Sequence, residues 1–242
     1  MRRLPLRPLA IIAVAVVLMA ACQPADAYAR RIPTGVGPGH PLSFRTFGAL
    51  TRRGQPEGAK PIALTFDDGP GPNTPAILDI LEHEHVPATF FMVGRQIRGS
   101  EAVIRRIVDD GFRVGDHTWD HADLRDVTGQ ALRDEIDWPL NLLNPLLRTD
   151  TVKCVRPPYG NSTPELRALL ADRGLAEAQW SVDPEDWKNP GSRAVIERVL
   201  GHAFPGAVVL MHDGGSHHGT VEALPTIITM LKAAGYSFVS IC

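Results

Sequence analysis

The residues with the clearest chemical potential are two adjacent acids, Asp67 and Asp68, in the stretch IALTFDDGPGP at residues 62–72. An apolar run leads into them, and a Gly-Pro-Gly-Pro turn follows them directly. Two neighbouring carboxylates repel each other and are costly to remove from water unless something compensates them. A cation would compensate the pair, because one carboxylate could bind it while the other accepts a proton from water.

A second cluster, GDHTWDH, contains His117 and His121 at a spacing of four residues. On the first turn of a helix, this spacing would place both imidazoles on one face. Two imidazoles and one carboxylate are a common ligand set for Zn²⁺ or a similar divalent cation, and they leave positions open for water and substrate. By itself such a pair is more often an ordinary feature of a surface helix, so a metal role requires that it lie near Asp67 and Asp68.

Three further motifs carry candidate groups. CVRPPYG contains Arg156, whose guanidinium could hold a catalytic carboxylate through paired hydrogen bonds, unless it is a surface residue of a rigid loop. WSVDPEDW offers Asp186 and Trp187, which could equally cap and pack a loop. VVLMHDGG places His212 at the end of an apolar strand, where a lone histidine is more often structural.

The elements that must position these residues alternate along the chain after residue 60. Strands are predicted at residues 62–67, 88–93, 112–117, 152–156, 176–182, 207–212 and 237–241. Helices are predicted at residues 73–85, 100–111, 128–147, 163–173, 192–202 and 220–234. Repeated alternation of strand and helix indicates an α/β fold with a largely parallel sheet covered by helices.

This alternation fits both a barrel and a doubly wound open sheet, and the polar residues help to choose between them. Asp67, His117, Arg156, Asp183 and His212 each lie at or just after the C-terminal end of a different predicted strand. Catalytic groups drawn from the ends of many strands are typical of a (β/α) barrel, whereas an open sheet gathers them at one switch point. We therefore favour the barrel.

The N-terminal segment has the features of an export signal. Basic residues precede an uninterrupted apolar stretch of 13 residues, Leu9–Ala21. This stretch is shorter than the roughly 20 residues of a membrane span. LMAAC favours lipidation of Cys22, although cleavage after Ala29 or retention as an uncleaved anchor are alternatives. The expected organisation is a signal peptide at 1–21, a tether at 22–60 and a single domain at 61–242 that works outside the cytoplasm.

The composition argues against a partner chosen by charge. The net charge is −2 and no long run of Lys or Arg occurs, so there is no electrostatic signature of nucleic-acid binding. An apolar content of 44% is sufficient for a packed core. There is no G-x-S-x-G motif to support a serine esterase, and no protein partner is implied.

Three cysteines are present. If Cys22 carries lipid, Cys154 and Cys242 remain, and an oxidising compartment favours a disulfide between them. The alternative is that both are small buried apolar residues.

The ordered set TFDDGP, HTWDH, RPPYG, DPEDW and LMHD resembles the five motifs of the polysaccharide deacetylase family, the NodB-type carbohydrate esterases. The resemblance covers roughly residue 61 to the C-terminus. It implies a distorted (β/α) barrel of seven or eight strands and a metal-dependent hydrolase that removes acetyl groups from a polysaccharide.

Transferred residue by residue, the resemblance implies that Asp68, His117 and His121 bind one divalent cation. Zn²⁺ is expected first, with Co²⁺, Ni²⁺ or Mn²⁺ as alternatives. Asp67 resembles the catalytic base of the family, and Arg156 resembles the residue that orients this base.

The remaining motif residues would complete the reaction. His212 resembles the catalytic acid, and Asp186 the residue that tunes it. The backbone amide of Tyr159 would help to stabilise the oxyanion, while Trp187 and Leu210 would line the pocket for the acetyl methyl group. The products would be acetate and a free amino sugar.

The motifs indicate the reaction and leave the polymer open. Export favours the cell's own wall, so we expect N-acetylglucosamine residues of peptidoglycan as the substrate. A chitooligosaccharide, an O-acetylxylan, or a wall-binding lipoprotein with little catalysis are the alternatives. His217 and His218 follow the last motif and could contact the substrate at the cleft rim, or be ordinary loop residues.

Overall fold

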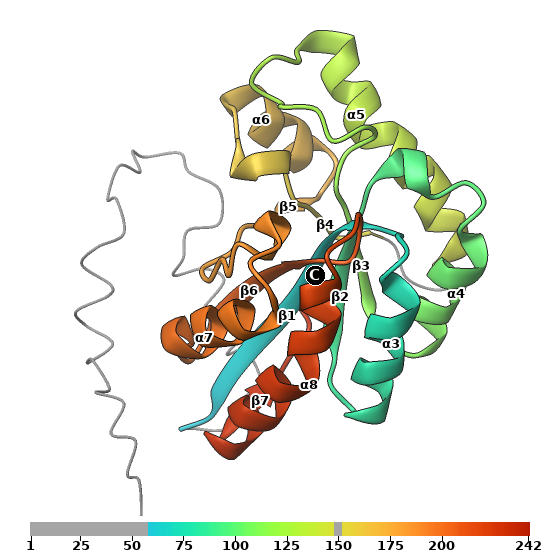
Figure 1. Ribbon diagram of the computed structural model, residues 1–242. Helices are drawn as coiled ribbons and strands as arrows, with labels where there is room; N and C mark the ends of the chain where they lie inside the picture. Colours follow the sequence, from blue (N-terminus) through green and yellow to red (C-terminus); the bar gives the residue numbers. More distant parts are fainter. Residues whose placement is uncertain (1–57, 148–151) are drawn as a thin grey trace, which may run out of the picture. The chain divides into compact units, whose positions relative to one another are not determined.

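A computed structural model of the protein describes residues 58–147 and 152–242 (Figure 1). The expected signal peptide at 1–21, Cys22 and all but the last residues of the expected tether lie outside the described residues. Among the described helices, none is both long and apolar enough to cross a membrane.

Each predicted strand and helix has a counterpart in the described chain. The strands are β1 Lys60–Gly69, β2 Ala88–Met92, β3 Arg113–Asp116, β4 Cys154–Val155, β5 Ala176–Glu177, β6 Ala207–His212 and β7 Tyr236–Phe238. The α-helices are α3 Thr74–His83, α4 Glu101–Asp109, α5 Gly129–Leu143, α6 Pro164–Asp172, α7 Ser192–His202 and α8 His218–Ala233. Short 3₁₀ turns are η1 Gly94–Gln96, η2 Asn144–Leu146, η3 Pro158–Gly160 and η4 Asp186–Lys188.

The strands form one parallel sheet in the order β5-β4-β3-β2-β1-β6, and β7 pairs with the beginning of β1. Its two edges meet through the segment predicted as a strand at 176–182. The first two residues of this segment form β5 beside β4, and Val182 forms a bridge to Val209 of β6. The sheet therefore curls into a distorted barrel, and helices lie around its outside (Figure 1). This confirms the predicted fold class.

Alternation along β1 separates the two faces of the sheet, because successive strand residues point to opposite sides. Ile62, Leu64 and Phe66 belong to the large core between the sheet and the helices. Ala63 belongs to a smaller apolar cluster of residues from β2, β4, β6 and the C-terminal segment, inside the curl of the sheet. Asp67 falls on this inner face, at the end of the strand.

The C-terminal segment fills the other end of the interior. The amide of Val239 donates to the carbonyl of Ile62, and the hydroxyl of Thr89 donates to the carbonyl of Ile241. Cys242 is bonded to Cys154, with 5.7 Å between their Cα atoms. The predicted disulfide is therefore confirmed, and it ties the C-terminal segment to β4.

Candidate active site

Sheet register gathers the candidate residues at one rim of the barrel. Asp67 of β1 lies directly opposite His212 of β6 in the pairing of these strands. The amide of His117, just after β3, donates to the carbonyl of Met92, and the amide of Arg156 donates to the carbonyl of Asp116. The parallel strands end on the same side, as the sequence predicted, and so they bring Asp67 and His212, which are 145 positions apart in the sequence (212 − 67), to one rim.

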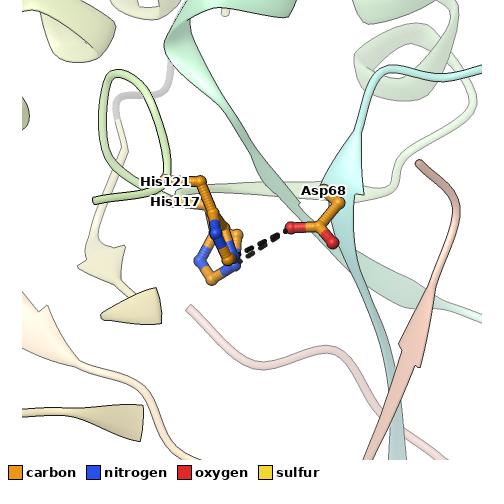
Figure 2. A group of neighbouring side chains, drawn as sticks. All are labelled: Asp68, His117 and His121. Carbon is orange, nitrogen blue, oxygen red and sulfur yellow. Dashed lines mark ion pairs between the residues drawn. The ribbon is translucent and has the colours of Figure 1, made fainter. Parts of the chain in front are cut away.

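Asp68, His117 and His121 form a compact group whose ligand atoms lie within 4.8 Å of one another. Oδ1 of Asp68 is 3.4 Å from Nε2 of His117 and 3.2 Å from Nε2 of His121, and Figure 2 shows both rings facing the carboxylate. One ion bound at about 2.1 Å by each ligand would hold its donor atoms roughly 3.0 to 3.5 Å apart. The two distances from Asp68 to the imidazole nitrogens lie in this range, so the group fits a single divalent cation.

The two histidines do not lie on a helix, and this part of the sequence interpretation was wrong. Residues 117–121 form an irregular loop, in which Thr118 and His121 have positive φ angles of 68° and 64°. Oδ1 of Asp116 accepts a hydrogen bond from the amide of Thr118, and the hydroxyl of Thr118 accepts one from the amide of His121. These local bonds compete with helix formation and fold the loop back. The two imidazole centroids are still only 4.9 Å apart.

The surroundings of the group favour metal binding. Nδ1 of His117 lies 2.6 Å from the carbonyl oxygen of Arg156. Because a carbonyl can only accept, Nδ1 carries a proton, and Nε2 is the ring nitrogen that would bind a cation beside Asp68. Oδ1 of Asp68 is buried and accepts no hydrogen bond within the described residues. Burial acts to raise the pKa of Asp68, but the neighbouring imidazoles of His117 and His121 lower it to about 2, so the carboxylate is charged and can bind a cation.

Asp67 is held by a buried arginine inside the barrel. Nη1 of Arg156 donates to Oδ1 of Asp67 at 2.7 Å and to the hydroxyl of Thr65 at 2.8 Å. The guanidinium lies 4.0 Å from the centroid of the Phe91 ring, which is an attractive arrangement for a cation. A Cβ at Gly115 would overlap this ring, so a glycine is required on the neighbouring strand. The paired charges offset the cost of burying each of them.

His212 is the second candidate for proton transfer. Its Nδ1 donates to Oδ1 of Asp186 at 2.7 Å, and its amide donates to Oδ2 at 2.9 Å. The hydroxyl of Thr220 on α8 also donates to Oδ2. Burial opposes a charge on the ring, but the hydrogen bond and charge of Asp186, with those of Asp67 and Asp68, raise the pKa of His212 to about 9. The imidazole is therefore protonated at neutral pH.

The remaining predicted residues lie around the same rim. Tyr159 in η3 has a positive φ of 60°, and its amide donates no hydrogen bond within the described residues. Its ring lies edge-on to His121, with 4.8 Å between centroids. Leu210 is buried and lies two residues before His212 in β6, whereas Trp187, next to Asp186, is 48% exposed.

Asp213 and His217 also lie near the rim. The sequence motifs gave Asp213 no role and gave His217 only a possible contact with the substrate. Asp213 is fully buried, and its Oδ2 accepts a hydrogen bond of 2.5 Å from the hydroxyl of Thr74. A Cβ at Gly69 would overlap this carboxylate, so Asp213 packs directly against the loop that follows Asp68. The ring of His217 lies 5.6 Å from that of His212. The signal for Asp213 was its position between the predicted acid and a Gly-Gly turn.

Fold and site together define a class of protein: an α/β barrel with a candidate metal group, an acid–arginine pair and an acid-bound histidine at one rim. The sequence pattern of the polysaccharide deacetylase family matches residues 54–178. A chitooligosaccharide deacetylase of Bradyrhizobium sp. (strain ANU 289) is 36% identical, over 78% of this chain and 93% of that protein. The chain therefore belongs to the polysaccharide deacetylase family, whose deacetylases are metal-dependent enzymes that remove N-acetyl groups.

Two further relatives strengthen the assignment. A peptidoglycan-N-acetylglucosamine deacetylase of Bacillus cereus is 38% identical, over 74% of this chain and 66% of that protein. The crystal structure of the Bc1960 peptidoglycan N-acetylglucosamine deacetylase superposes with a TM-score of 0.73 at 37% identity. That match covers 77% of this chain and 88% of the other. The family predicted from the motifs is confirmed.

Proposed function

We propose that this protein hydrolyses the N-acetyl groups of N-acetylglucosamine residues in peptidoglycan and releases acetate. The observation that carries the proposal is the pairing of β1 with β6, which sets Asp67 beside His212 at the rim that also holds the metal group. A hydrolysis of this kind needs a base on one side of the acetamide and an acid near the leaving amine. We assign Asp67 as this base and His212 as this acid.

We assign Asp68, His117 and His121 as ligands of one divalent cation. Zn²⁺ is the first choice because it favours imidazole and carboxylate ligands, and Co²⁺, Ni²⁺ or Mn²⁺ accept the same set. The bound cation supplies Lewis-acid chemistry, because it polarises the acetamide carbonyl and lowers the pKa of water toward ~7.

The assigned proton transfers follow from the hydrogen bonds of each side chain. Arg156 occupies Oδ1 of Asp67, whereas Oδ2 lies 3.6 Å from Nε2 of His117 and so faces the metal group. Asp67 is thus placed to take a proton from the attacking water through Oδ2. Asp186 occupies Nδ1 of His212, which leaves the Nε2 proton of the charged ring for the departing amine.

The oxyanion and the acetyl methyl group also need partners. The amide of Tyr159 lacks a hydrogen-bond partner in the described chain and is the proposed oxyanion donor. One such donor contributes roughly 3 kcal/mol in comparable sites. Trp187 and Leu210 are the proposed lining of the methyl pocket.

The choice of peptidoglycan rests on the relatives and on the N-terminal sequence. The Bacillus cereus relative and the Bc1960 structure are described as peptidoglycan N-acetylglucosamine deacetylases. The apolar stretch Leu9–Ala21 and the following Cys22 favour export, with the lipidated cysteine as a membrane anchor. The proposed location is therefore the cell envelope, where the acetylated wall polymer is the partner.

A second candidate substrate is a chitooligosaccharide. The Bradyrhizobium relative carries this name, and the match covers 93% of its length. An O-acetylxylan would use the same catalytic residues. A wall-binding protein without catalysis is disfavoured, because the proposed base, acid and three ligands are all present at one rim.

Acetate release tests the proposal. The full chain, loaded with Zn²⁺, would be incubated in parallel with peptidoglycan, chitooligosaccharides and acetylxylan, with Asp67→Asn as the matched control. Release from peptidoglycan by the wild type alone supports the proposal. Preference for another polymer would keep the chemistry and replace the substrate, whereas no release from any of them would reject the enzymatic function.

A further inference from the structure

A pocket of about 490 Å³ lies between η1 and α5, outside the set of residues assigned above. Its lining consists of two indoles, two guanidiniums, an amide and an aliphatic side chain: Trp119, Trp138, Arg95, Arg98, Asn141 and Leu142. We call it the Trp–Arg pocket. Aromatic walls with a few polar groups are typical of small-molecule binding sites.

Regular local geometry brings these side chains together. Trp138, Asn141 and Leu142 are spaced by three and four residues on α5, so they share one face of this helix. Arg95 lies in η1, and Arg98 lies in the turn that follows it, three residues further along the chain. The pocket is thus formed by one face of α5, by η1 with the turn after it, and by Trp119.

The pocket presents two exposed guanidiniums, and each has a carboxylate in its neighbourhood, Asp120 for Arg95 and Glu101 for Arg98. Arg98 is exposed and makes no ion pair or hydrogen bond with any other described residue. Arg95 pairs with Asp120 at 2.7 Å but remains 63% exposed. Beside them, the indole of Trp138 is 47% exposed and packs edge-on against Trp119, with 5.4 Å between centroids. A guanidinium binds carboxylates through two parallel hydrogen bonds, and an indole offers a flat apolar face to a sugar ring.

The pocket is joined to the proposed metal site through a shared loop. Trp119 lies between the two proposed ligands His117 and His121 in the sequence. The amide of Gly94 donates to the carbonyl of Thr118 at 2.8 Å, and the amide of Arg95 donates to the carbonyl of Trp119 at 2.9 Å. These bonds fix η1 to the loop that carries the proposed ligands His117 and His121, so the pocket and the proposed metal site share one loop.

From this arrangement we infer that the Trp–Arg pocket binds a carboxylate-bearing sugar unit of the substrate chain. The inference rests on the proposed function and makes it more specific. In peptidoglycan, the sugar next to N-acetylglucosamine carries a lactyl group that ends in a carboxylate or a peptide with free carboxylates. A neutral chitooligosaccharide has no such group. The pocket therefore favours the wall polymer over chitin fragments.

Comparison of two soluble substrates tests the inference. Arg98→Gln and Trp138→Ala would be measured on a peptidoglycan tetrasaccharide with free carboxylates and on neutral N-acetylglucosamine tetramer, using the Zn²⁺-loaded full chain. A charge-assisted hydrogen bond contributes about 1.5 kcal/mol or more, which corresponds to roughly tenfold in affinity. We expect kcat/KM to fall about tenfold in Arg98→Gln on the charged substrate and less than about twofold on the neutral one. Arg105→Gln, an exposed arginine on α4 outside the pocket, controls for the loss of surface charge.

A binding measurement keeps the inference separate from the catalytic proposal. Muramyl dipeptide would be titrated into the full-chain Asp67→Asn protein, with and without Arg98→Gln, by calorimetry. Weaker binding in the double variant supports the pocket even if acetate release fails and the proposed function is rejected. Equal losses of kcat/KM on both substrates, or unchanged binding of muramyl dipeptide, would overturn the inference.

Discussion

Replacing Asp186 by Asn should move the alkaline limit of activity to lower pH. Asp186 is the principal cause of the raised pKa of His212, which lies at about 9 against an ordinary value of 6.5. This difference corresponds to roughly 3 kcal/mol in favour of the charged ring. In Asp186→Asn the amide oxygen can still accept from Nδ1, but the negative charge is lost and burial then opposes protonation. The pKa of His212 should fall to its ordinary value or below it.

The pH profile of kcat/KM for acetate release measures this change. If His212 is the general acid, the wild type loses activity as the pH rises through about 9, because the ring loses its proton. In Asp186→Asn, the pH at which kcat/KM is lost on the alkaline side should be about two units lower. Thr220→Val is the matched control, since it removes a hydrogen bond to Asp186 and keeps the charge. If the wild type and Asp186→Asn lose kcat/KM at the same alkaline pH, the reasoning is refuted.

The same linkage has a consequence for stability. A pKa raised in the folded state stabilises the fold fully below pH 6.5, and this contribution is lost as the pH rises through about 9. Asp186→Asn should therefore lower the free energy of unfolding at pH 6 more than at pH 10. Urea unfolding of both proteins at the two pH values measures the difference.

Three further predictions concern single side chains. Asp67→Asn should lower kcat by about 10² to 10⁴, as expected for loss of a general base, and metal content should be unchanged by mass spectrometry. Wild-type turnover in this variant would remove Asp67 from the base role. His121→Ala should lower metal content and acetate release together, and a full metal complement would exclude it as a ligand. Cys242→Ser opens a cross-link between residues separated by 88 positions, so the free energy of unfolding should fall by about 2 to 4 kcal/mol in urea titration; an unchanged midpoint would contradict this.

Much of the fold could be predicted from the sequence because short apolar runs bounded by turns mark the buried strands. The run before Asp67 became β1, and the rhythm of strands and helices gave the parallel sheet. The segment predicted as a strand at 176–182 pairs as β5 over only two residues and meets β6 at Val182. The pattern of apolar residues along the sequence does not show that one segment pairs first with β4 and then with β6.

The site was predictable in its residue types and less so in its local backbone. A spacing of four residues suggested a helix for His117 and His121, but the loop between them is set by side-chain-to-backbone bonds and positive φ angles. The packing of Asp213 against Gly69 and the pairing of Arg95 with Trp138 in one pocket depend on contacts between distant elements. No periodicity in the sequence reports such contacts.

Several residues around the proposed metal site have strained backbone conformations, and this strain bears on how the protein can evolve. Asp68, Thr118, His121 and Tyr159 are four of the eight described non-glycine residues with positive φ. This conformation costs on the order of 1 kcal/mol for each residue. A change such as Asp68→Gly would relieve strain and remove a proposed metal ligand in the same step. Selection for a more stable barrel alone would therefore tend to remove the proposed catalytic residues, so descendants that lose the activity are expected to be more stable than their active ancestors.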